Sequence, residues 1–397
     1  FYTIPAIAYN HANDISFLQL GNKYTFFERF PLYTFLQGIF YKSISPFFSI
    51  NFYNYRIINL FIFVALLIIS LKIFRNFARE NKSKDLYKII FFPICLALSP
   101  MSQTYLLARP ETLGILINLI GIIFYLNNDQ KIRPYKYEIS FFAFGLSVLC
   151  HPSFLIFNFF IFLQFLIKHK IKKNLSCFIS NILPILILIY YYYINLPESL
   201  SQLNMQASGL PYFKAWYGLI NYSFNIFYNE STLIGLINTL YYMPSLLLLC
   251  FTIFIINKNF YLIKRIKNNE IIISLFVSSI AILLLERNHP YLINIACFYL
   301  IFFIFLMPWN KIIIKKYKSI LINKKNLLFI LTLSIFSISS WNLIHFSKFQ
   351  FYKEKYLENS TFINFKNKIL LENEAVIVTR PEIMPYFIKE IDLKYII

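Results

Sequence analysis

Residues 136–168 read KYEISFFAFGLSVLCHPSFLIFNFFIFLQFLIK, two apolar segments joined by a short turn and bounded by a lysine at each end. Two helices of about 15 residues would each rise about 22 Å, whereas the hydrocarbon core of a bilayer is about 30 Å thick. The Cys150-His151-Pro152-Ser153 turn is therefore expected below the membrane surface. Irregular backbone at that depth requires surrounding protein or a water-filled cavity. We expect a cavity open to the outside, with His151 near its floor or wall.

The composition of the whole chain is that of a membrane protein. Of its 397 residues, 58% are hydrophobic and only 14% are charged, whereas a soluble domain carries about a quarter charged residues. Recurring apolar runs predict an all-α polytopic membrane protein with about ten transmembrane helices. These helices are expected at roughly 53–71, 88–106, 111–127, 138–151, 153–167, 176–196, 232–256, 271–286, 291–308 and 327–345.

Loops rich in lysine and arginine alternate along the chain with loops that are poor in them. Of 38 lysines and arginines, 23 lie in the loops 72–88, 128–137, 168–175, 257–268 and 309–325. The positive-inside rule places these loops in the cytoplasm. The net charge of +20 is then explained by topology and lipid headgroups, and no nucleic-acid partner is expected. Because the chain would start outside, we also expect a first membrane helix to be missing before Phe1.

The unusual polar residues all fall in the loops that are expected outside. They are Asp14, Glu28, Arg29, Arg109, Glu111, His151, Glu286, Arg287 and His289. Charges at the ends of membrane helices are costly unless they face water or each other. The five cysteines and five histidines show no metal-ligand spacing, so no metal site is predicted. A divalent ion held by Asp14 and Glu28 stays an open alternative.

Each polar cluster has a chemical interpretation and a structural alternative. Asp14 is suited to act as general base for an incoming hydroxyl. Glu28 is either a second acid or the ion-pair partner of Arg29. Arg29 is itself suited to bind a phosphate. Arg109 offers a planar fork that suits phosphate, but Arg109-Pro110-Glu111 is also explained by an ion pair capping the next helix. The 286–291 segment indicates an anion site or a plain outside loop.

Segments outside the membrane open and close the chain. Residues 1–52 form the first outside loop, in which Ile15–Leu20 and Pro31–Ile44 are expected to be short amphipathic helices along the membrane surface. The polar tail 346–397 is interpreted as a small α/β outside domain that the sequence truncates. Residues 1–345, which include the first outside loop, are expected to form the transmembrane domain.

These features together resemble the GT-C superfamily of polyprenyl-phosphate-sugar-dependent glycosyltransferases, such as the lipid A aminoarabinose transferase and the protein O-mannosyltransferases. Asp14 matches the acid in the family's first outside loop, although a second acid directly beside it is absent. The 27–33 segment FERFPLY is similar to a Lys-Pro-Pro-Leu-Tyr element, with Arg29 in place of lysine. Ala108-Arg109-Pro110-Glu111 resembles the motif of the family's second outside loop. Residues 287–292 have a weaker similarity to the family's late Arg-Tyr-Leu-x-Pro element.

The resemblance implies a multi-pass enzyme of the inner (plasma) membrane with its active site facing the periplasm or exterior. It would transfer a sugar, with inversion, from a polyprenyl phosphate to a hydroxyl of a lipid, glycan or protein acceptor. No cofactor is expected, with the divalent ion as the open alternative. The implied roles are general base for Asp14, assistance from Glu28 or Glu111, phosphate binding for Arg29, Arg109 and Arg287, and cavity lining for Tyr33, His151 and His289. A lipid-linked-glycan flippase or other transporter and an O-antigen-type polymerase stay as alternatives.

Overall fold

The computed structural model describes residues 31–44, 46–47, 57–80, 87–98, 109–127, 135–169, 171–194, 266–285 and 290–307. These residues are mostly helical and contain no strand. Their helices are α2 (Pro31–Ile44), α3 (Ile57–Glu80), α4 (Tyr87–Leu98), α6 (Glu111–Leu126), α7 (Lys136–Val148), α8 (Phe154–Lys168), α9 (Ile171–Ile194), α13 (Asn269–Leu285) and α14 (Pro290–Leu306). The expected spans at 232–256 and 327–345 and the tail domain 346–397 lie outside the described residues.

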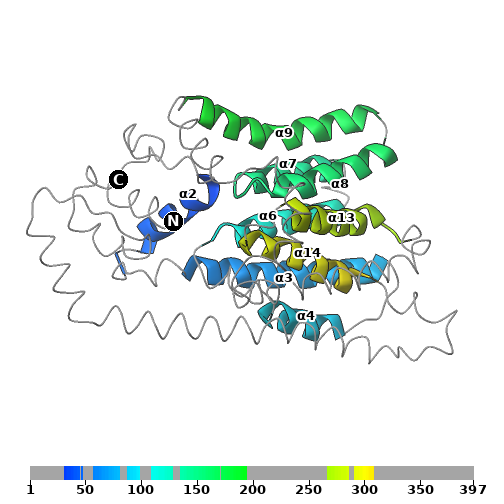
Figure 1. Ribbon diagram of the computed structural model, residues 1–397, viewed down its shortest axis with the longest axis horizontal. Coiled ribbons are helices and arrows are strands. Elements are labelled where there is room, and N and C mark those ends of the chain that lie inside the picture. Colours follow the sequence, from blue (N-terminus) through cyan, green and yellow to red (C-terminus); the bar gives the residue numbers. More distant parts are fainter. Residues whose placement is uncertain are drawn as a thin grey trace, which may run out of the picture.

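The helices from α3 to α14 run side by side as one bundle, and α2 lies at one end of it (Figure 1). Helix α6 packs between α3 and α7, while α7 also packs against α9. Helix α13 packs against α14 and α8, and α4 contacts α14 and α3. In this view α9 and α4 form the two opposite edges of the bundle.

Helix α3 is longer than the sequence predicts. The expected span ended at residue 71 with a basic loop behind it, but the helix continues to Glu80. Ile73, Phe74 and Phe77 are buried. Helix α3 therefore keeps an apolar face for two further turns, although basic residues occur in the same turns. Among the described residues, α3 is the one helix long and apolar enough to cross a membrane by length and composition. The other apolar helical segments there have 10–17 residues.

Aromatic rings fill the core where α3, α4 and α14 meet. The ring centroid of Phe74 lies 4.8 Å from that of Phe92 and 4.8 Å from that of Phe302. All three side chains are buried. Rings at these separations pack favourably beyond the area they bury, so this cluster joins α14 to helices from the first quarter of the chain.

Two glycines permit the close packing of α7 with its neighbours. A Cβ on Gly121 of α6 would overlap the ring of Phe144 on α7. A Cβ on Gly145 of α7 would overlap the backbone carbonyl of Asn181 on α9. Small residues at helix crossings let backbones approach closely, as in membrane helix bundles.

Polar contacts define one end of the bundle. Lys168 at the end of α8 pairs with Glu270 at the start of α13, and the hydroxyl of Tyr125 donates to Glu270 Oε1 at 3.0 Å. Asn268 Nδ2 donates to Glu80 Oε2, at the end of α3, at 2.7 Å. The ends of α3, α6 and α8 therefore lie together with the start of α13. The opposite end holds the starts of α3, α6 and α8.

Candidate functional site

The charged pair Arg109–Glu111 lies at the start of α6. Glu111 is the first residue of the helix and is fully buried, whereas the side chain of Arg109 is 21% exposed. Arg109 Nε lies 3.1 Å from each carboxylate oxygen, and Nη2 lies 2.6 Å from Oε1. Of the two sequence interpretations of this motif, the local ion pair at a helix start is therefore present. The buried carboxylate also suits the positive end of the helix dipole.

Asn59 of α3 connects this motif to α2. Its Oδ1 accepts a hydrogen bond of 2.8 Å from the hydroxyl of Tyr33, and its Nδ2 donates to the carbonyl oxygen of Arg109 at 3.3 Å. Asn59 and Tyr33 are both fully buried. Tyr33, expected as a cavity-lining residue, is thus enclosed in protein and anchors α2 through its hydroxyl.

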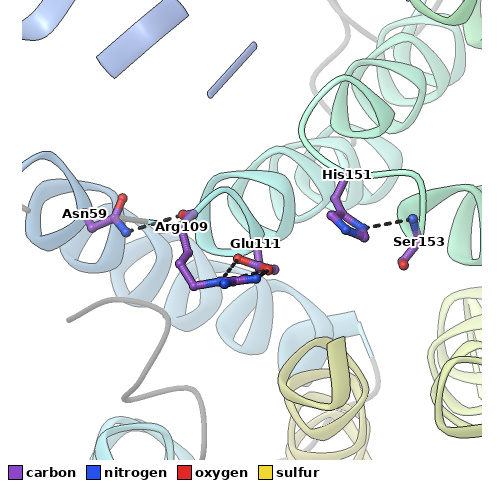
Figure 2. A network of polar contacts seen from close by, with 5 residues as sticks. All are labelled: Asn59, Arg109, Glu111, His151 and Ser153. Carbon is purple, nitrogen blue, oxygen red and sulfur yellow. Dashed lines mark hydrogen bonds and ion pairs between the residues drawn. The ribbon is translucent and has the colours of Figure 1, made fainter. Parts of the chain in front are cut away.

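The α7–α8 turn meets the same region from the other side. Leu32 N, in the first turn of α2, donates to the carbonyl of Leu149 at the end of α7 at 3.3 Å. In this turn His151 Nδ1 accepts a 3.2 Å hydrogen bond from Ser153 N, directly before α8. In Figure 2, Asn59 lies to one side of the Arg109–Glu111 pair and His151 to the other.

The predicted hairpin is confirmed in its outline. The turn that joins α7 and α8 holds residues 149–153, and the helices have 13 and 15 residues. They are therefore about 20 Å and 22 Å long. Whether the turn lies below a membrane surface stays a prediction, since no membrane is part of the structure.

The structure gathers four of the predicted site residues at one end of the bundle. Tyr33, Arg109, Glu111 and His151 come from α2, the start of α6 and the α7–α8 turn. The remaining candidates, Asp14, Glu28, Arg29, Arg287 and His289, lie outside the described residues. Within the described ranges, no group of three histidine, cysteine, aspartate or glutamate residues is placed to hold a metal ion.

The geometry suits Arg109 and Glu111 to different roles. Both oxygens of Glu111 accept hydrogen bonds from Arg109 in a fully buried setting, which suits a residue that orients a cation. The side chain of Arg109 is 21% exposed, and its planar guanidinium carries three N–H donors beyond the Nε–H and the Nη2–H that bond Glu111. It is suited to bind an anion such as phosphate.

Asn59 carries no distinctive motif in the sequence. It is one amide at the beginning of an apolar run, in a chain where asparagine is abundant. A polar side chain inside such a run is costly to bury without a partner, and this is the signal that marks it. Its partners come from residues 26 positions before it and 50 positions after it, so they are not readable from local sequence.

No protein-family model, curated protein or solved structure matches the chain.

Proposed function

We propose that this chain is a membrane glycosyltransferase that moves a sugar from a polyprenyl phosphate to a hydroxyl acceptor on the outer face of the membrane. The observation that carries the proposal is the convergence of the Arg109–Glu111 pair with the His151 turn and the anchored start of α2. Each of these segments has its own polar motif in the sequence, and all lie at one end of the bundle.

An apolar stripe on α9 supports the membrane location. Exposed apolar side chains run from Leu175 to Tyr193 along the face of α9 that points away from α7, a length of about 27 Å. The stripe consists of Leu175, Phe178, Ile179, Leu183, Leu186, Ile187, Ile189, Tyr190 and Tyr193. Large contiguous apolar patches are rare on soluble monomers, and the length of this stripe is close to the hydrocarbon thickness of a bilayer, about 30 Å.

In the proposed reaction, Arg109 binds the donor phosphate and neutralises the charge that develops as the phosphate leaves. Glu111 holds the guanidinium in place. Asp14 removes the proton of the acceptor hydroxyl, whose oxygen then forms the bond to the anomeric carbon from the side opposite the departing phosphate. One such displacement inverts the anomeric centre. Arg29 and Arg287 are assigned to the same phosphate, and His151 and His289 to the sugar cavity.

The test is sugar transfer by the purified protein in lipid vesicles, with radiolabelled polyprenyl-phosphate pentoses and hexoses as probes. Asp14→Asn removes the proposed base, and transfer is expected to fall at least about 100-fold. The control is Glu138→Gln, which removes a carboxylate at the opposite end of the bundle, where Glu138 accepts a hydrogen bond from Ser176. Undiminished transfer by a folded Asp14→Asn protein would refute the assignment.

The same vesicles separate the enzyme from a transporter. A transferase releases the sugar from its lipid and attaches it to an acceptor. A flippase moves the intact labelled lipid between leaflets without breaking the sugar–phosphate bond. Movement of intact lipid without transfer to any acceptor would replace the proposed function by transport.

A further inference from the structure

Two consecutive residues of helix α2 form hydrogen bonds with the bundle. The Leu32 N–H bonds the Leu149 carbonyl and the Tyr33 hydroxyl bonds Asn59. The first contact joins an N–H from the first turn of one helix to a carbonyl at the end of another, two groups that lack partners within their own helices. The start of α2 therefore bridges the His151 turn and the segment that carries Arg109.

The buried side-chain amide of Asn59 joins α2 to the Arg109 segment. Asn59 has one side-chain acceptor in contact with Tyr33 and one side-chain donor in contact with the Arg109 carbonyl. If Tyr33 leaves, Asn59 Oδ1 loses this buried partner, and the amide gains by rotating toward a new one. Rotation withdraws the donor from the Arg109 carbonyl. The position of Arg109 thus depends on the docking of α2.

We propose that Asn59 is a positioning residue for Arg109, which transmits the docked state of α2 to the phosphate-binding arginine. Tyr33 is the contact through which α2 acts on it. The part of this inference that concerns phosphate rests on the proposed function. The mechanical part, that α2 and the Arg109 segment loosen together, does not depend on any activity.

Hydrogen–deuterium exchange tests the mechanical part. Exchange is followed in peptides covering 31–44 and 109–116 for Tyr33→Phe and Asn59→Leu. Each substitution is expected to speed exchange in both segments by about two- to tenfold, the effect of one buried hydrogen bond on local opening. The double variant is expected to match the larger single effect, because both changes break the same chain of bonds.

A chemically matched pair elsewhere in the bundle provides the control. Asn118 Nδ2 donates to the Tyr299 hydroxyl at 2.7 Å, linking α6 to α14. Tyr299→Phe removes one hydroxyl from a tyrosine–asparagine contact, as Tyr33→Phe does. It is expected to leave exchange in 31–44 unchanged. If Asn59→Leu speeds exchange in 31–44 but not in 109–116, the proposed link is overturned.

Transfer kinetics test the part that concerns phosphate. Arg109→Ala and Asn59→Leu are each expected to lower kcat/KM for the polyprenyl-phosphate sugar, and the double variant is expected to be no worse than Arg109→Ala alone. Multiplied losses in the double variant would refute a role of Asn59 through Arg109. If the unmodified protein transfers no sugar, the proposed function fails, and the exchange experiment still decides whether α2 and the Arg109 segment are coupled.

Discussion

Removing Arg109 and removing Glu111 should lower the free energy of unfolding by different amounts. Glu111 is fully buried and Arg109 is partly exposed. Removing one partner of a buried ion pair costs about 3–5 kcal/mol when the charge left behind stays buried. Arg109→Met leaves the carboxylate of Glu111 in that situation, so we expect a loss of unfolding free energy of about 3 kcal/mol.

Removing the other partner, Glu111, should lower the free energy of unfolding by less. After Glu111→Leu, the guanidinium of Arg109 can turn toward water, so the loss is limited to hydrogen bonds and the helix-dipole contact, about 1–2 kcal/mol. The double variant Arg109→Met/Glu111→Leu buries no charge at this position. We expect its stability to lie within about 1 kcal/mol of the unmodified protein.

Stability is measured by following helical circular dichroism during denaturant unfolding in detergent micelles, and sugar transfer is measured on the same preparations. The double variant should recover stability without recovering transfer, because the proposed phosphate ligand is gone. If Glu111→Leu destabilises the fold more than Arg109→Met, the buried carboxylate is not the member that needs its partner. In that case the reasoning from burial is wrong.

Two further predictions concern helix packing. Gly145→Ala places a methyl group against the backbone carbonyl of Asn181 and should destabilise the bundle by about 1–3 kcal/mol. Gly121→Ala meets the ring of Phe144 instead and should cost less, which comparison of the two unfolding midpoints checks. Asn158 Nδ2 donates to Asn181 Oδ1 at 2.7 Å, so Asn158→Leu should cost about 0.6–2 kcal/mol. An unchanged unfolding midpoint in this variant would contradict a stabilising α8–α9 bond.

The local sequence pattern predicts where several of the helices and turns lie. The bounds of α2, Pro31–Ile44, agree with the prediction, and the turn at 149–153 falls where the apolar runs 138–151 and 153–167 meet. These features depend on helical periodicity and on turn residues such as Pro152, both of which act over a few positions. The amphipathic helix expected at 15–20 lies outside the described residues.

Tertiary packing decided where α3 ends and which polar side chains meet, neither of which follows from helical periodicity. Helix α3 passes its predicted end because Phe74 and Phe77 find buried surroundings, and these depend on neighbours such as α4 and α14. The Arg109-Pro110-Glu111 motif left two interpretations open, and the fold formed the ion pair by burying Glu111 beside a partly exposed Arg109. Asn59 forms hydrogen bonds with Tyr33 and with the Arg109 carbonyl, two groups that lie far from it in the sequence. A hydrogen-bond partner far along the chain is set by how helices pack, whereas the sequence specifies chiefly which face of each helix avoids water.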